Sequence, residues 1–285
     1  MNRLGIRSIV LFLVCALAGC SLFYNYRNID RYIRWSLDDY IAWDSLQQDQ
    51  LRTRLAVQLT WHQKTQLPRY REWLEAIDRT LDNGNGNEVD VTQLAQAADQ
   101  LQSFWQDTAA HLQEDIGAQL ASLSDVQVAD MIGVMRENQA DLKTEYDDMT
   151  LAELIKKRSR EMKKRLKYWL GPLNDKQIAM IDAWAQRVPD GRARWLNNRE
   201  RWTDAFAQAL QHRHEPELFA ADIQRLFVTP QENWDAEYRE LTQHNLESTL
   251  QLFTELLNSR TQEQREVQRK RIAQWRGHLD QLAAY

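Results

Sequence analysis

Cysteine, glycine and proline are all scarce in this chain of 285 residues, which contains two, nine and five of them respectively. An all-β domain needs a turn signal every ~8–12 residues, and so few glycines and prolines do not supply one. Disorder is excluded because eleven Trp, nine Tyr and seven Phe bring too much aromatic surface to leave in water. The net charge of −5 argues against a general nucleic-acid-binding protein, which carries a strongly basic domain. The composition therefore favours a packed helical protein.

The sequence also lacks the short motifs that build catalytic and cofactor sites. It contains no His-Glu-x-x-His pair of zinc ligands, no Gly-x-Ser-x-Gly nucleophile turn and no glycine-rich phosphate loop. Oxyanion and phosphate sites that are built from backbone groups rely on glycine, which is rare here. We therefore expect no cofactor and no resident metal, and we favour a protein that binds over one that catalyses.

The first twenty residues are typical of an export signal. Two arginines precede an apolar run at residues 8–18, which is shorter than the ~20 residues that a transmembrane helix needs. The run ends in Leu17-Ala18-Gly19-Cys20, which resembles the bacterial lipobox. The resemblance implies cleavage before Cys20 and attachment of acyl chains such as palmitate, which hold a protein at a membrane. The next residue, Ser21, is not Asp, and by this resemblance it indicates the outer membrane.

Cleavage at this motif divides the chain into three parts. We expect a signal peptide at residues 1–19, a lipidated cysteine with a short tether at 20–27, and a single helical domain at 28–285. The tether spans at most ~25 Å, which keeps the domain close to the bilayer. Removal of the signal takes away two arginines and no acid, so the net charge falls from −5 to −7.

Helical periodicity dominates the rest of the chain. Residues Val91, Leu94, Ala98, Leu101 and Trp105, for example, recur at steps of three and four. We expect a break or kink at Pro68 and a loop at residues 83–87. The clearest predicted helices lie at about 91–120, 128–146, 151–169, 175–188, 192–212, 216–227, 230–258 and 262–283. The predicted fold is all-α, an elongated multi-helix bundle with kinked helices.

Several helix starts share a capping-box pattern. In this box a short polar side chain accepts from an exposed backbone N–H, and a Gln or Glu three residues later bonds back. The pattern occurs at residues 45–48, 124–127, 150–153, 174–177 and 229–232. Each box adds roughly 1 kcal/mol to helix stability.

Two family resemblances follow from these motifs. The segment Trp35-Ser36-Leu37-Asp38-Asp39-Tyr40, soon after the lipobox, resembles an uncharacterised family of proteobacterial lipoproteins. That resemblance implies a wholly helical mature domain and no assigned activity. The segments 123–127, 173–177 and 228–232 are similar to the Leu-Thr-x-x-Gln signature of Spy-type periplasmic stress chaperones, although the capping box alone explains them.

Three groups of side chains are candidates for binding a partner. The first is a basic helix face, which suits anionic lipid or an acidic peptide, or is a solvated face neutralised by nearby acids. The second is the segment after the tether, which docks a partner or packs on the bundle. The third is a Trp and Arg face that is core or a binding groove. The basic face consists of Lys156, Arg160, Lys163 and Lys167. The segment after the tether contributes Trp35, Asp38, Asp39 and Tyr40, and the Trp and Arg face contributes Trp195, Arg199 and Trp202.

Catalytic and metal-binding alternatives remain open at this point. Asp38 and Asp39 are adjacent carboxylates, but neighbouring helix positions point ~100° apart and do not flank one bond by themselves. With Asp148, they are the acids that a cell-wall turnover enzyme or its accessory would use. His212 and His214 lie two positions apart, so they diverge on a helix, but they leave a metal-responsive protein as a third interpretation.

The leading expectation is a lipid-anchored binding protein. We expect it to face the periplasm from the outer membrane and to act without catalysis in envelope assembly or quality control. Its partners would be the membrane, through acylated Cys20, and an envelope protein or peptide. Nucleic acid is not expected as a partner because of both the compartment and the net charge.

Overall fold

The computed structural model describes residues 26, 28–81 and 88–284, and within these ranges it contains helices and no β-strand. The fold is therefore an all-α multi-helix bundle, as the sequence predicts. The helices are α3 (Ile29–Asp38), α4 (Ser45–Leu81), α5 (Val91–Ala121), α6 (Asp125–Asp147), α7 (Leu151–Leu170), α8 (Asp175–Arg187), α9 (Arg192–Gln211), α10 (Pro216–Ile223), α11 (Ala236–Asn258) and α12 (Gln262–Ala283).

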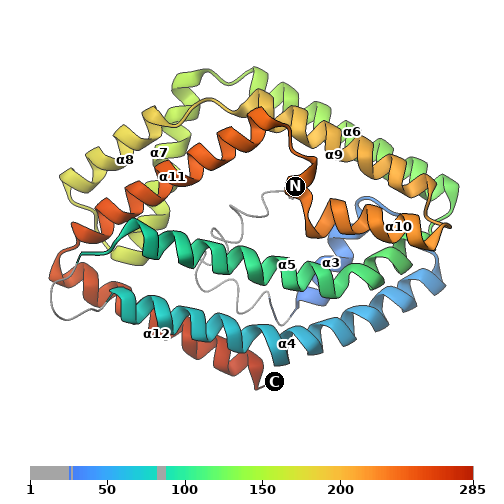
Figure 1. Ribbon diagram of the computed structural model, residues 1–285, viewed down its shortest axis with the longest axis horizontal. Helices are drawn as coiled ribbons and strands as arrows, with labels where there is room; N and C mark the ends of the chain where they lie inside the picture. Colours follow the sequence, from blue (N-terminus) through green and yellow to red (C-terminus); the bar gives the residue numbers. More distant parts are fainter. Residues whose placement is uncertain (1–25, 27, 82–87, 285) are drawn as a thin grey trace.

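The helices form an elongated closed loop (Figure 1). On one side α4 packs along α12 and α5, and on the other side α6 packs against α9. Helices α7, α8 and α11 close one end, while α10 joins α9 to α5 at the other. Separate hydrophobic clusters fill these contacts, and they are centred on Leu210 and Ile223, on Ile181 and Leu252, and on Ile272.

Of the break or kink predicted at Pro68, the break is wrong, because α4 continues through the proline as one helix of 37 residues. Tertiary packing compensates for the missing backbone hydrogen bond. The neighbouring Leu67 is buried and Tyr70 is half-buried, both in the cluster that α4 shares with α12. The predicted loop at residues 83–87 lies outside the described residues.

The predicted helix start at residues 229–232 is also wrong. Residues Gln224–Val228 form a π-helical turn after α10, and the Thr229 amide donates to the Gln224 carbonyl. This bond fixes the Thr229 backbone outside the extended conformation that an N-cap needs (φ −121°, ψ 51°). Pro230 therefore opens a short 3-10 turn, and α11 begins only at Ala236 behind the N-cap Asp235.

The remaining capping boxes are largely as expected. Ser124, Thr150 and Asn174 each cap a helix with a Gln or Glu at the third helical position. The first box is displaced by one residue, because the Asp44 carboxylate accepts from the backbone N–H of Gln47 at 2.8 Å and the predicted cap Ser45 is already helical. Two boxes that the sequence analysis did not identify begin at Asp90 and Thr261.

Four of these boxes meet in pairs through their glutamines. The side-chain amides of Gln47 and Gln127 each donate to the other's side-chain oxygen, at 3.1 and 2.7 Å. Gln47 also donates to the Ser122 carbonyl, and Gln127 donates to the Ala42 carbonyl. This arrangement, the Gln47–Gln127 joint, links the starts of α4 and α6 across 80 positions of the chain.

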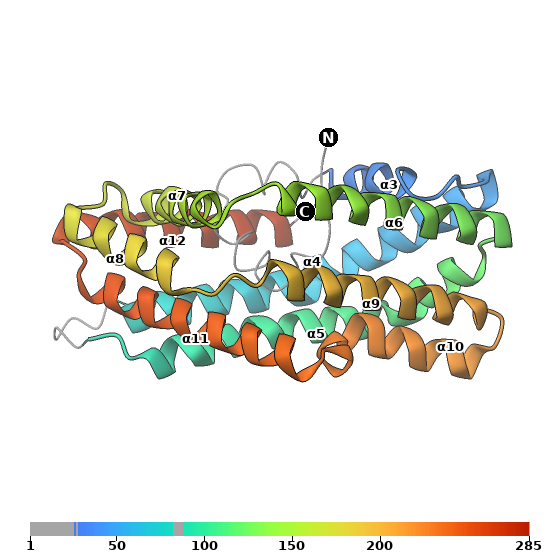
Figure 2. The same ribbon diagram turned by 90° about the horizontal axis from the view of Figure 1, so that it is seen from above.

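The same arrangement recurs between Gln177 and Gln264. Their amides exchange two hydrogen bonds of 2.9 Å, and the further donors reach the carbonyls of Ser259 and Pro172. This Gln177–Gln264 joint links the starts of α8 and α12 across 87 positions. The two joints lie at opposite ends of the long axis, as both views show (Figures 1 and 2). Equivalent polar contacts thus hold the helices together at both ends of the loop.

Candidate binding site beside α9

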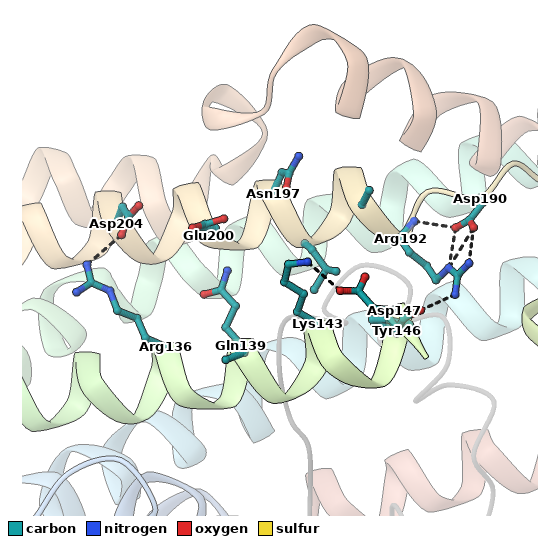
Figure 3. Close-up of a pocket in the computed structure, with 13 residues that line it drawn as sticks. Arg136, Gln139, Lys143, Tyr146, Asp147, Asp190, Arg192, Asn197, Glu200 and Asp204 are labelled. Carbon is teal, nitrogen blue, oxygen red and sulfur yellow. Dashed lines mark hydrogen bonds and ion pairs between the residues drawn. The ribbon is translucent and has the colours of Figure 1, made fainter. Parts of the chain in front are cut away.

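A groove of about 680 Å³ runs between α6 and α9, and most of the residues that line it are charged or polar. Both helices contribute residues to it, Asn197 of α9 among them, and the Gln139 amide on α6 points toward α9 near its middle part (Figure 3). The two helices are antiparallel here, because Arg136 pairs with Asp204 while Tyr146 contacts Trp195 further along. The groove therefore follows the helix pair for several turns and suits an elongated ligand.

Ion pairs neutralise most of the charges in the groove. Arg136 and Asp204 lie 3.1 Å apart, and Lys143 lies 2.9 Å from Asp147. All four side chains are more than half exposed, so water screens each pair and the pairs exchange readily with a ligand's charges. Glu200 lies between these pairs (Figure 3).

The other end of the groove is more rigid. Arg192 makes a bidentate pair with Asp190, at 2.6 to 3.1 Å, and donates to the backbone carbonyls of Tyr146 and Met149. These carbonyls lie at the C-terminal end of α6, where a cation is favourable. Hydrogen bonds from Arg192 lower the pKa of Asp190, so that Asp190 remains a carboxylate near neutral pH.

The predicted Trp and Arg face of α9 lies beside the groove but does not line it. The Trp195 ring meets the Tyr146 ring edge-on at 5.7 Å, and Trp202 stacks on Phe206 at 5.1 Å. The Trp202 indole also donates to the Leu226 carbonyl at 3.0 Å. Trp195 and Trp202 are therefore half-buried packing residues, and Arg199 between them is buried.

The segment after the tether divides in the same way. Trp35 is 46% exposed on α3, and Asp38 and Asp39 are exposed at its end. Tyr40 instead packs against the cluster that contains Phe206, and it interacts electrostatically with Arg199. The fold thus brings Tyr40 together with Arg199 and Trp202, which belong to a different candidate group in the sequence.

The basic face of α7 is split. Lys163 binds Asp182 at 2.6 Å, and this contact lowers the pKa of that carboxyl group. Lys156, Arg160 and Lys167 remain exposed, with Arg160 lying 3.4 Å from Glu161. Part of the face therefore holds α7 to α8, and the rest is available to solvent.

The two histidines of the metal interpretation have different surroundings. His212 Nδ1 lies 3.5 Å from Asp222, while exposed His214 follows the buried Arg213. Across the described ranges, no group of three or more His, Cys, Asp and Glu side chains is arranged to hold a metal ion. The described helices also include none that is long and apolar enough to cross a membrane. Cys20 and residues 1–19 lie outside the described residues.

A comparison with protein families gives one match. The model of DUF6279, described as a family of unknown function, matches residues 39–239, which is more than half of the chain. The chain belongs to this family. No curated protein and no solved structure matches it. Membership in DUF6279 confirms the expected uncharacterised domain, and it leaves the function to be inferred from the fold.

The groove is the feature that the sequence analysis did not identify. Its lining residues Lys143, Asn197 and Glu200 are ordinary exposed polar positions on two amphipathic helices, and Gln139 is half-buried. One signal was present, since α6 and α9 both carry alternating charges on a solvent-facing side. That signal does not say which two helices pair, so it does not locate a groove.

Proposed function

We propose that this DUF6279 protein is a lipid-anchored, periplasm-facing binding protein that holds a segment of another envelope polypeptide in the groove between α6 and α9. The observation that carries the proposal is the groove itself, which is long and lined by side chains of both charge signs. A role in envelope assembly or quality control follows from this combination of anchor and groove.

The chemistry of the lining suits an extended polypeptide. The amides of Gln139 and Asn197 can donate to backbone carbonyls and accept from backbone N–H groups. The exposed pairs Arg136–Asp204 and Lys143–Asp147 can exchange partners with a ligand that carries both signs of charge. Such an exchange favours specificity over raw affinity, because the gain in Coulomb energy is small.

The same lining favours binding over catalysis. Acid catalysis needs a carboxyl group that keeps its proton near neutral pH. Asp190 has the opposite property, because Arg192 lowers its pKa. A cell-wall turnover enzyme would instead require a raised carboxyl pKa next to the bound glycan.

The anchor is proposed from the lipobox at residues 17–20. It predicts that the mature protein begins at Cys20 and carries acyl chains there, which mass spectrometry of the N-terminal peptide measures. Cys20→Ser should release the protein from the membrane fraction. An unacylated N-terminus at another residue would overturn the anchor while leaving the groove proposal intact.

The groove is tested by photo-crosslinking in cells. A photoreactive amino acid replaces Asn197 in the groove, and a matched probe replaces Gln208, which is exposed on the same helix outside the groove. We expect one dominant polypeptide adduct from position 197 that is absent from position 208. The charge reversal Lys143→Glu should weaken that adduct.

Two outcomes would contradict the proposal. Equal adducts at both positions would mean that the groove has no preference. Adducts at position 197 with peptidoglycan fragments alone would move the function to the cell wall.

A further inference from the structure

Arg199 is a buried cation without a counter-ion in the described part of the chain. Its side chain is 9% exposed, and its Nε and Nη1 atoms are buried with no hydrogen-bond acceptor. The nearest group with π electrons is the Trp195 ring, whose centroid lies 5.9 Å from the guanidinium carbon. A cation–π contact at that distance is at the outer limit for a useful interaction.

Two other arginines are buried in the described ranges, and they show what a satisfied guanidinium looks like in this fold. Arg213, 7% exposed, donates to the Leu123 carbonyl at 3.0 Å and forms an ion pair with Asp125. Arg260, 8% exposed, donates to the Leu257 carbonyl at 2.5 Å. Both arginines bind the ends of helices, so their charges are part of the joint regions. The Arg199 guanidinium makes no such contact with a helix end in the described part of the chain.

An unpaired buried charge is costly. Burial lowers the pKa of Arg199, although a guanidinium remains charged at any physiological pH. A cation in this state destabilises the fold relative to an apolar side chain of the same size. An anion supplied by a ligand removes that cost and regains strong, charge-assisted hydrogen bonds.

The surroundings limit which anion fits. The Trp195 ring lies 5.9 Å from the guanidinium carbon and presents aromatic surface on that side, which suits an apolar group attached to the anion, and Tyr40 interacts with Arg199 electrostatically. The single positive charge of Arg199 balances one carboxylate, whereas a doubly charged phosphate would keep an uncompensated negative charge in the site. The preferred ligand is therefore a monocarboxylate with an apolar body.

This position is distinct from the groove. Arg199 does not line the groove, and it points ~100° away from its neighbour Glu200, which does. We propose that Arg199, with Trp195 and Tyr40, forms a second binding site, which takes a carboxylate attached to an apolar group. The carboxylate can come from a polypeptide terminus or from a fatty acid, since both have this chemistry.

The test uses the purified full chain and three probes of similar size. Phenylbutyrate has the required charge, phenylbutanol lacks it, and phenyl phosphate doubles it. We expect phenylbutyrate alone to raise Tm, by about 3 °C or more at a concentration near ten times its Kd. Equal shifts with phenylbutanol, a larger shift with phenyl phosphate, or no shift with phenylbutyrate would each overturn the proposal.

Two variants assign the effect to the residue. Arg199→Met should melt no lower than wild type without ligand and should lose the phenylbutyrate shift. Arg201→Met on the same helix removes an exposed arginine that pairs with Asp235, and it should keep the shift. A shift that survives in Arg199→Met would overturn the assignment. If Arg199→Met does not fold, Arg199→Lys should fold and bind phenylbutyrate at least tenfold more weakly, because it loses the bidentate geometry. Unchanged affinity would overturn the proposal.

The source of the carboxylate is then decided by competition. Displacement of phenylbutyrate by a peptide with a free C-terminal carboxylate, but not by its C-terminal amide, identifies a polypeptide terminus. Displacement by octanoate and not by the peptide identifies a fatty acid. Displacement by neither would overturn the site as a natural carboxylate site.

Discussion

The two glutamine joints have the same hydrogen-bond pattern but different surroundings. In the Gln177–Gln264 joint the two side chains are 0% and 4% exposed, and Gln177 also donates to the Ser259 hydroxyl. In the Gln47–Gln127 joint Gln47 is 4% exposed, whereas Gln127 is half-buried. The amide pair itself therefore needs only two capped helix starts, while its burial depends on which other side chains pack over it.

The residue before the second cap of each joint differs as well. Leu123 precedes Ser124 in the first joint, and Arg260 precedes Thr261 in the second. A guanidinium lies near both joints all the same, because Arg213 reaches the Leu123 carbonyl from after α9. The cation near the Gln47–Gln127 joint, Arg213, thus comes from a distant segment, whereas Arg260 precedes the second cap of the Gln177–Gln264 joint directly.

The largest expected effect comes from removing the buried amide. Gln177→Ala should lower the free energy of unfolding by about 2–4 kcal/mol, because it leaves the Gln264 amide buried without its partner. Gln47→Ala should cost about 1–2 kcal/mol, since water can reach the half-buried Gln127. Urea unfolding of the two variants measures the difference. Equal losses would show that burial does not distinguish the joints.

A fall in pH acts on the middle of α4, where His62 lies, and not on the amide pairs of the two joints. His62 lies between Tyr26 and Tyr70, at 2.8 and 3.2 Å, and burial lowers its pKa to about 4. The unfolded chain binds a proton near pH 6.5 and the fold does not, so stability falls as the pH drops from about 6.5 to about 4.

The expected loss at about pH 5 is about 2 kcal/mol, in wild type and in both joint variants. The gap between Gln177→Ala and Gln47→Ala should therefore stay constant between about pH 7 and 5. His62→Phe removes the titrating group and should reduce the acid-induced loss, as urea unfolding at each pH will show. A gap that closes in acid would mean that a titrating group acts on one joint more than on the other.

Double-mutant cycles compare the joints more directly. Gln177 and Gln264 should couple by about 1–2 kcal/mol, and Gln47 and Gln127 by about 0.5–1 kcal/mol, because hydrogen bonds are stronger away from water. Each cycle combines two Gln→Ala changes and follows chemical unfolding. Stronger coupling between Gln47 and Gln127 than between Gln177 and Gln264 would show that burial does not strengthen the amide pair.

The smallest expected difference lies in the caps themselves. Ser124 and Thr261 each accept from the backbone N–H of their glutamine at 3.2 Å. Ser124→Ala and Thr261→Ala should each cost about 1 kcal/mol and differ by less than about 0.5 kcal/mol. Thermal unfolding that separates them by more would show that the caps also depend on the surrounding packing.

The sequence alone predicted most helix starts, and the reason is local. A cap and the residue three positions later belong to one helical turn, so the contact between Ser124 and Gln127 needs no other part of the chain. The failures at Pro68 and Thr229 arise where packing overrides the local pattern. Leu67 and Tyr70 pack α4 through the proline, and the π-helical turn fixes Thr229 away from a cap conformation.

Tertiary structure alone decided which capped starts meet and which charged groups find partners. The sequence does not say that Gln47 meets Gln127, or that Arg213 reaches an acceptor while Nε and Nη1 of Arg199 find none among the described residues. These contacts join segments tens of residues apart, and they result from the sum of many weak packing contacts across the bundle. Helix starts are therefore set within one turn of chain, whereas the groove and the buried Arg199 exist only once α6, α9 and Tyr40 have packed together.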